Sequence, residues 1–224
     1  SRRLLRMGLL PPHIASREWG AERSAAAFRF VADYVRAFEA PHCTLLFRLA
    51  LDAVAGLAGP DRRLSVVDVG AHLGDCCLWA AARVGPERLR CLSFEINEDA
   101  LAVLRQTVAL SGLEGTVEVH ARRIGASSVC DGNEGPVPLG CFLAAGGGAA
   151  DLVKVHVQGS ELEVLGGLLE AFRAGRIGMA LVRTRLTPLR AVEDFFKSHD
   201  LAYHVRGSAD GFDAIVVPDE ERWL

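Results

Sequence analysis

A glycine turn flanked by acids is the stretch whose residue types best suit ligand binding. It spans residues 68–75 and places Asp68 and Asp75 around Gly70 and Gly74. Gly70 lets the chain turn sharply after an apolar strand, and Gly74 removes a side chain where a ligand must approach the backbone. The helix that follows offers free N–H groups. An ordinary strand-to-helix turn is the alternative explanation for this segment alone.

The spacing of the glycines narrows the class of ligand. Dinucleotide folds use Gly-x-Gly-x-x-Gly and phosphate loops end in Gly-Lys-Ser/Thr, whereas this turn has Gly-x-x-x-Gly. Because Asp68 precedes the first glycine, we expect a cationic or hydroxyl-bearing ligand here rather than a phosphate.

A second acid lies about twenty residues beyond the glycines, at the end of the apolar run Leu89–Glu95. A carboxylate at this position can accept hydrogen bonds from both hydroxyls of a ribose. Asn97 follows as a helix cap, and Glu98 and Asp99 suit the positive end of that helix. The turn and Glu95 together favour a nucleoside cofactor, although an isolated Glu is more often a surface residue.

A third segment, residues 151–168, carries a family resemblance. Its sequence Asp-Leu-Val-Lys-Val-His-Val-Gln-Gly-Ser-Glu-Leu-Glu-Val-Leu-Gly-Gly-Leu resembles the Asp-Leu-hydrophobic-Lys-hydrophobic-Asp-Val-Glu-Gly-Ala-Glu signature of the FkbM-type methyltransferases. With the glycine turn and Ser93-Phe94-Glu95, this gives three ordered matches over roughly residues 64–217. The resemblance implies the class I fold and S-adenosylmethionine as cofactor above the first two strands. The cofactor-binding residues it implies are Asp68, Gly70, Ala71, His72, Gly74 and Glu95.

Two positions depart from the family pattern, because His156 stands where the family has Asp and Arg183 stands where an acid usually ends the next strand. Side chains alternate along a strand, so Lys154 shares a face with His156, and Arg183 shares one with Arg185. If these strands are neighbours, we expect a basic rim that suits an anionic acceptor or docks a protein partner. The alternative is that the two arginines are solvated at a strand end.

His156 is the one plausible general base in the matched motifs. A histidine with its reference pKa of about 6.5 is largely neutral near pH 7 and can accept a proton from a hydroxyl acceptor. A hydrogen-bonded histidine without a chemical role is the alternative. Two functions follow: methylation of oxygen on a small or glycosidic acceptor, or a catalytically inactive methyltransferase-like subunit of a larger, organellar assembly.

The composition predicts a globular α/β protein. The chain has 224 residues, of which 50% are hydrophobic and 24% charged, with a net charge of −3. No basic patch interleaved with aromatics is present, so we expect no nucleic-acid partner. No apolar run is long enough for a transmembrane segment. The six cysteines lack paired metal spacing, so we expect no metal site and reduced, packed thiols.

Alternating strand and helix patterns predict a parallel sheet followed by an antiparallel C-terminal hairpin. The family resemblance implies the complete fold, a doubly wound, mostly parallel seven-stranded sheet of the Rossmann-like class I methyltransferase type. The expected strands are Leu64–Val69, Leu89–Glu95, Thr116–Ala121, Leu152–His156, Ile177–Arg183, Tyr203–Arg206 and Phe212–Val217. Helices are expected over Gly74–Arg83 and Glu98–Ser111, after a capping box formed by Ser160 and Glu163, and after Thr187 as cap with Pro188 in first position.

The remaining segments set the domain organisation. We expect a basic arm and two helices, separated near Pro41, over residues 1–60, and the methyltransferase-like domain over residues 61–224. Residues 1–17 contain four arginines and no acid, which fits an organelle-targeted precursor (mitochondrion or plastid) or simply a solvated basic stretch of a cytoplasmic protein. Residues 125–150 contain seven glycines and two prolines without a clear period, which predicts a lid or an unused loop.

Overall fold

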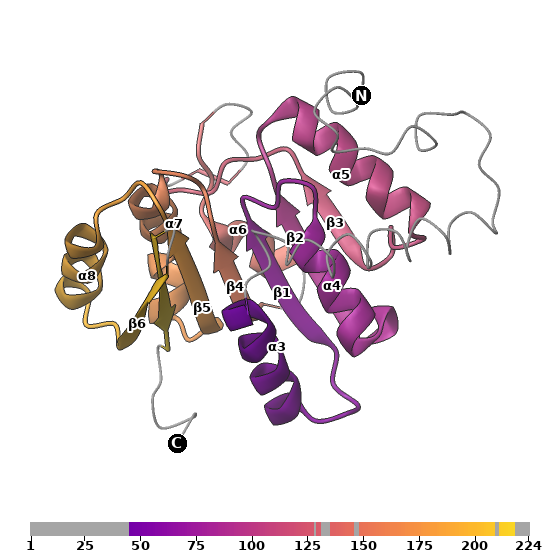
Figure 1. The fold of residues 1–224 in the computed structure, drawn as a ribbon, viewed down its shortest axis with the longest axis horizontal. Helices are drawn as coiled ribbons and strands as arrows, with labels where there is room; N and C mark the ends of the chain where they lie inside the picture. The colour runs from indigo at the N-terminus through magenta and orange to yellow at the C-terminus, as the bar shows by residue number, and fades with distance from the viewer. Residues whose placement is uncertain (1–44, 128, 131–134, 146–147, 209–210, 218–224) are drawn as a thin grey trace.

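The computed structural model describes residues 45–127, 129–130, 135–145, 148–208 and 211–217. Within this part of the chain, seven strands form one sheet in the order β3-β2-β1-β4-β5-β7-β6 (Figure 1). Strands β1 to β5 are parallel, and β7 is antiparallel to both β5 and β6. The predicted fold class is confirmed. The strands are β1 (Leu64–Val69), β2 (Leu89–Phe94), β3 (Val117–His120), β4 (Ala150–Val155), β5 (Ile177–Thr184), β6 (Tyr203–Ser208) and β7 (Gly211–Val216).

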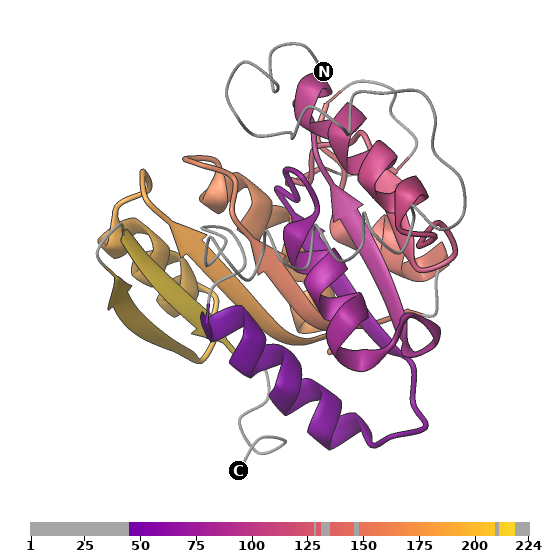
Figure 2. The same cartoon turned by 45° about the vertical axis from the view of Figure 1, so that its right-hand side comes forward.

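Helices cover both faces of the sheet (Figures 1 and 2). They are α3 (Leu45–Ala58), α4 (Asp75–Val84), the short 3-10 turn η2 (Pro86–Arg88), α5 (Glu98–Leu110), α6 (Leu139–Ala145), α7 (Glu161–Arg173) and α8 (Leu189–Ser198). Helices α3, α4 and α5 share one apolar core with the sheet, and α6, α7 and α8 share the other. The second of the two expected N-terminal helices is therefore α3, which lies against the sheet through the buried Phe47 and Leu51.

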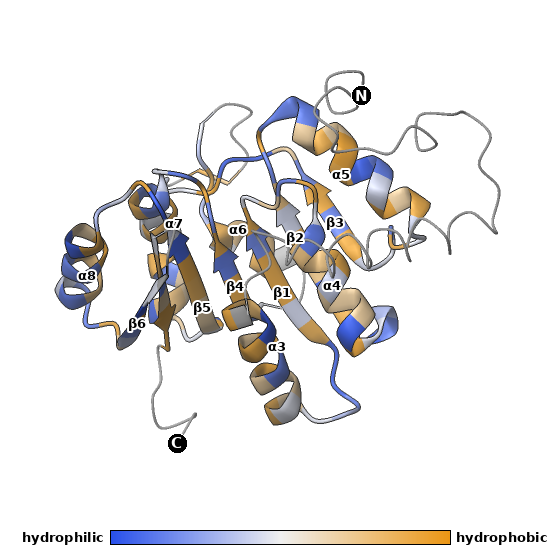
Figure 3. Ribbon diagram, viewed as in Figure 1, coloured by the Kyte–Doolittle hydropathy of each residue, from blue (hydrophilic) through white to orange (hydrophobic). Residues whose placement is uncertain are grey.

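Burial on both faces explains the composition of the central strands. In β1, every residue except Ser65 is buried, and β2 and β4 show the same pattern with one partly exposed residue each. Parallel strands that are covered by helices on both sides read as nearly continuous apolar runs. Figure 3 shows this difference between the strands and the more hydrophilic α8, of which only Val192 and Phe196 are buried.

Two predicted helix caps are wrong, for a shared reason. The side chain of Ser160 makes no capping bond to α7, and α8 begins after Pro188 rather than at it. The fully buried Glu161 instead accepts hydrogen bonds from the Gly159 N–H and from the Thr187 hydroxyl. This buried carboxylate links the loop after β4 to the loop after β5, an interaction between distant residues that a local capping pattern does not reveal.

The glycine-rich segment 125–150 is more regular than its sequence indicates. It contains α6, whose Leu139 and Leu143 are fully buried, and a parallel bridge joins Ile124 to Val137. The two leucines have the i, i+4 spacing of a helix face, but the helix is too short to stand out among seven glycines.

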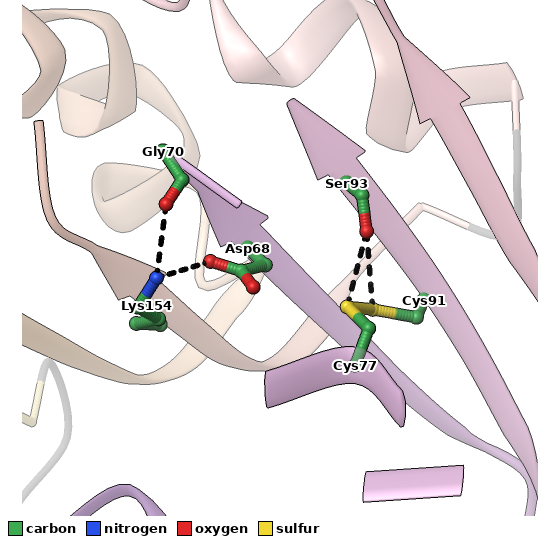
Figure 4. Close-up of a disulfide and its surroundings, with 6 residues drawn as sticks. All are labelled: Asp68, Gly70, Cys77, Cys91, Ser93 and Lys154. Atoms are coloured by element: carbon green, nitrogen blue, oxygen red, sulfur yellow. Dashed lines mark hydrogen bonds and ion pairs between the residues drawn. A yellow bond between two sulfur atoms is a disulfide. The ribbon is translucent and has the colours of Figure 1, made fainter. Parts of the chain in front are cut away.

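The expectation of reduced thiols is wrong for four cysteines. Disulfides join Cys77 to Cys91 and Cys130 to Cys141, and Cys76 is a free, buried thiol. Figure 4 shows the first disulfide, which links α4 to β2 beside the hydroxyl of Ser93. Cys77 and Cys91 meet within the buried core, so their sequence spacing gives no sign of the pairing.

Several expectations concern residues outside the described part of the chain. They are the Arg-rich start with its targeting role, and the helix expected between Ser24 and Pro41. These expectations and the domain boundary at residue 60 stay predictions. Within the described residues, no helix is both long enough and apolar enough to cross a membrane.

Candidate functional site

A cavity of about 510 Å³ opens at the carboxyl edge of the sheet, where the loops after β1, β2, β3 and β4 meet. This edge is where open α/β sheets bind ligands, and the volume lies within the usual range for small-molecule sites. The cavity is lined by Val69, Gly70, His72, Leu73, Phe94, Glu95, Ile96, Asn97, Asp99, Ala100, Arg122, Arg123, Ile124, His156, Val157, Gln158, Ser160 and Val164.

The glycine turn is held between its two neighbouring strands. The N–H groups of Gly70 and Ala71 both donate to the Phe94 carbonyl oxygen, at 2.9 and 3.0 Å. On the other side, a Cβ atom added to Gly70 would lie 2.1 Å from the His156 carbonyl oxygen. Gly70 also has a φ of +78°, in the left-handed region that favours glycine. Both the conformation and the space around this position therefore require glycine.

Glu95 directly follows β2 and lines the cavity, and its carboxylate is already well occupied. It accepts the His72 N–H at 2.8 Å through one oxygen and the N–H groups of Ile96 and Asn97, each at 2.8 Å, through the other. A carboxylate offers about four acceptor positions, so about one remains for a ligand hydroxyl. Glu95 thus clamps the glycine turn to β2 as well as facing the cavity.

Beneath the cavity floor lie three of the predicted cofactor-binding residues, since Asp68 and Ala71 have no exposed surface and Gly74 is buried. Gly74 has a φ of +84° and lies close to Leu104 of α5. These residues shape the turn, whereas Gly70, His72 and Glu95 line the cavity itself.

The predicted basic rim does not form at Lys154. Its ammonium group lies 2.6 Å from the Asp68 carboxylate, and the side chains are 2% and 0% exposed. Burial alone would lower the pKa of Lys154, but Asp68, Cys76 and Asp75 raise it above its ordinary value. Lys154 is thus a buried cation beneath the turn, where it can neither dock a partner nor contact an acceptor directly. The strand pattern could not show that Asp68 lies next to Lys154 on the neighbouring strand.

His156 does reach the cavity. It follows β4, its N–H donates to the Val69 carbonyl oxygen at 2.9 Å, and it is 5% exposed. The residue therefore borders the glycine turn from the β4 side and lines the cavity. This position suits a proton acceptor next to a bound cofactor.

The two arginines at the end of β5, Arg183 and Arg185, lie outside the cavity. Arg183 is aligned with Asp213 of β7, and neither Arg183 nor the exposed Arg185 lines the cavity. Burial raises the pKa of Asp213, and the positive charges of Arg183 and Arg206 oppose that shift. Arg183 thus serves as a local counter-charge in the hairpin.

Sequence reasoning missed a different basic pair, because Arg122 and Arg123 line the cavity from the loop after β3. Arg123 also lies 3.9 Å from the Glu163 carboxylate. The signal was available: both arginines directly follow a predicted strand, at the sheet edge where the other site residues were expected.

An aromatic cluster supports this side of the cavity. The ring of Phe94, which lines the cavity, stacks on His120 with a centroid separation of 5.0 Å, and Phe142 of α6 packs on both rings. Burial lowers the pKa of His120, against the raising effect of Glu118 and with the lowering effect of Arg90. His120 is therefore favoured in its neutral form. Among the described residues, no group of three or more His, Cys, Asp or Glu side chains is arranged to hold a metal ion.

Comparison with known proteins shows the fold and nothing finer. No family model and no curated protein matches the chain. Among solved structures, the METTL16 MTase domain superimposes with a TM-score of 0.59 at 12% identity, covering 89% of this chain and 81% of that one. Streptococcus pneumoniae Sp1610, a candidate tRNA (m1A22) methyltransferase, superimposes with a TM-score of 0.52 at 13% identity, covering 78% of this chain and 68% of that one. M. capricolum TrmK superimposes with a TM-score of 0.46 at 15% identity. The superposition covers 74% of this chain, and the chain spans about 65% of the length of TrmK.

The superpositions on the METTL16 MTase domain and on Sp1610 establish a class I methyltransferase fold. The chain has the seven-stranded sheet and terminal hairpin expected from its sequence, and it is similar in shape to domains described as methyltransferases. Identities of 11–15% among such structures transfer no activity by themselves, because one fold serves many functions.

Proposed function

We propose that the protein is an S-adenosylmethionine-dependent methyltransferase. The observation that carries the proposal is the cavity above β1 and β2, which both the left-handed Gly70 turn and Glu95 line. Its place on a methyltransferase fold, at the edge where such folds bind their ligands, supports the same function.

The residues present fit this cofactor. A Cβ at Gly70 would close the turn against His156, and Glu95 keeps about one acceptor position for a ribose hydroxyl. Gly70, His72 and Glu95 would hold the cofactor from the cavity wall, with Asp68, Ala71 and Gly74 shaping the turn beneath them. When bound, S-adenosylmethionine supplies a methyl group activated by its sulfonium charge.

The protein's own contribution is to position groups and move a proton. His156 lines the cavity next to the glycine turn, so its imidazole can take the proton of a hydroxyl acceptor. We propose O-methylation of FkbM type on this basis, supported by the signature at residues 151–168. Arg122 and Arg123 on the cavity wall favour an acceptor with negative charge.

For the acceptor, we propose a small or glycosidic molecule. A net charge of −3 and the absence of a basic aromatic patch in the sequence favour a small or glycosidic acceptor. The similarity in fold to a candidate tRNA methyltransferase keeps a nucleic-acid acceptor open.

The inactive-subunit alternative has less support. It needs basic residues at the strand ends as a docking surface, but Lys154 is buried and Arg183 faces Asp213. We therefore do not propose it as the main function.

A methyl-transfer assay tests the proposal. Wild-type protein and His156→Ala are incubated with methyl-labelled S-adenosylmethionine and separate pools of small glycosides, RNA and protein. We expect labelling in the glycoside pool and a decrease of about 10²–10⁴-fold in turnover for His156→Ala, with cofactor affinity nearly unchanged. Labelling of RNA alone would correct the acceptor class. Equal turnover in the variant would remove His156 as the base.

A further inference from the structure

We propose that Lys154 is a positioning residue that holds the cofactor-binding turn in shape from below. The inference rests on the proposed function for the identity of the ligand, but the contacts on which it depends are independent of that ligand. Figure 4 shows the Lys154 side chain reaching from β4 to both Asp68 and Gly70.

Two hydrogen bonds define this contact. The Lys154 ammonium donates to the Asp68 carboxylate at 2.6 Å and to the Gly70 carbonyl oxygen at 3.1 Å. Lys154 and Asp68 are also direct neighbours in the parallel register of β4 and β1. The register brings the two side chains together, and the carbonyl of the turn lies within reach of the same ammonium group.

The Lys154 ammonium binds the second of the two polar backbone groups of Gly70. The Gly70 N–H is bound to the Phe94 carbonyl oxygen at 2.9 Å, and its own carbonyl oxygen is bound to Lys154. The Ala71 N–H, in the next peptide, donates to the same Phe94 carbonyl oxygen at 3.0 Å. The His72 N–H, one peptide further on, donates to the Glu95 carboxylate at 2.8 Å. Without the ammonium, the Gly70 carbonyl oxygen would lose this hydrogen bond, whereas the Gly70 N–H would still be bound to Phe94 of β2.

The charges of Lys154 and Asp68 lie in the protein interior, outside the cavity. Lys154 is 2% exposed and does not line the cavity, so it acts through Gly70 rather than by touching a ligand. Asp68, Asp75 and Cys76 surround the ammonium and favour its charged form despite burial. The lysine of the 151–168 signature thereby acquires a role in cofactor binding, in place of the acceptor or docking role that its strand pattern indicated.

A purely structural role is the competing explanation, in which Lys154 only neutralises the buried Asp68. Removing one partner of a buried pair leaves the other charge uncompensated, whereas replacing both with well-packed hydrophobic residues of similar volume often preserves stability. The double variant Asp68→Leu/Lys154→Met therefore separates the two roles, since it removes the charge problem and the bond to Gly70 together.

The experiment compares wild type, Lys154→Met, the double variant and Arg62→Met. Arg62 is the control, because its guanidinium lies 2.7 Å from the Asp151 carboxylate at the other end of β4. Asp151 also accepts the N–H of Ser65 in β1, so this pair joins the same two strands far from the turn. Urea denaturation gives stability, calorimetric titration with S-adenosylmethionine and S-adenosylhomocysteine gives affinity, and hydrogen exchange gives protection of the Gly70, Ala71 and His72 amides.

We expect the double variant to fold with near wild-type stability, to bind both ligands about 10-fold more weakly, and to exchange the turn amides faster. Arg62→Met should match wild type in affinity and in exchange at the turn. A double variant with wild-type affinity and protection would overturn the positioning role.

Failure of the proposed function is separable from failure of this inference. If the wild type binds neither ligand, the proposed cofactor is wrong, and the hydrogen-exchange comparison alone decides the role of Lys154. Faster exchange at the turn in the double variant then supports positioning, and unchanged exchange contradicts it.

Discussion

The two sides of the cavity are built in different ways. At the ends of β1 and β2, the turn is fixed by two bonds to the Phe94 carbonyl oxygen and one from the His72 N–H to the Glu95 carboxylate, which Ile96 and Asn97 hold in place through two further bonds. At the ends of β4 and β5, His156 reaches the cavity while Arg183 and Arg185 do not line it. The comparison indicates that a network of hydrogen bonds, made by backbone groups and by the Glu95 carboxylate, fixes one side of the cavity, whereas His156 is the individual side chain that reaches it from the other side.

The largest effect on stability and on cofactor binding should come from Gly70→Ala, because this substitution changes the hydrogen-bonded turn itself. The added Cβ would lie 2.1 Å from the His156 carbonyl oxygen, at a φ of +78°. Left-handed strain of about 1–2 kcal/mol and overpacking of about 1–3 kcal/mol should together lower the free energy of unfolding by about 2–5 kcal/mol. Urea denaturation measures the loss, and cofactor binding should disappear.

Gly112→Ala provides the control for this prediction. Gly112 has a φ of +65° but nothing within 4 Å of an added Cβ. Only the conformational strain of about 1–2 kcal/mol should therefore appear. Equal losses for the two variants would show that the contact with His156 carries no weight.

A smaller effect is expected from Glu95→Ala, which removes the clamp between the turn and β2. Loss of charge-assisted hydrogen bonds costs about 1.5–3 kcal/mol, so cofactor affinity should fall roughly 10- to 100-fold. Calorimetric titration measures this change, and Asp99→Ala, an exposed cavity-lining acid, is the control with a lesser effect. Unchanged affinity in Glu95→Ala would remove Glu95 from the site.

The smallest effect concerns His120, below the aromatic wall of the cavity. Burial lowers its pKa in the folded protein, so the unfolded chain binds a proton more readily. The free energy of unfolding should therefore fall as the pH drops through the ordinary pKa of histidine toward the lowered folded value. His120→Phe should flatten this decline while keeping the stacking on Phe94 and Phe142. Urea denaturation between pH 7 and pH 5, about the range over which histidine titrates, checks it, and identical pH profiles would contradict the assignment.

The sequence placed more of its candidate residues at the cavity from the ends of β1 and β2 than from the ends of β4 and β5, and the reason is physical. The glycine turn and the acid at the end of β2 are local patterns, with residues that belong to one loop or one strand end. The cavity accordingly includes Gly70, His72 and Glu95.

The features that sequence analysis missed depend on contacts between distant segments. The Lys154 pair with Asp68 spans 86 positions, and the buried Glu161 takes its bond from Thr187 rather than from a local cap. Neither partner can be chosen before the register of the strands is known. The Arg122 and Arg123 pair is an exception, because its place after a predicted strand already indicated the sheet edge.

Calorimetric titration of the wild-type protein with S-adenosylmethionine tests the central claim most directly, with Gly70→Ala and the nucleoside adenosine as negative and partial-ligand controls. The account predicts saturable binding at one site per chain in the wild type, weaker binding of adenosine and none in the variant. Absence of S-adenosylmethionine binding by folded wild-type protein would contradict the claim that the cavity above β1 and β2 is a methyl-donor site.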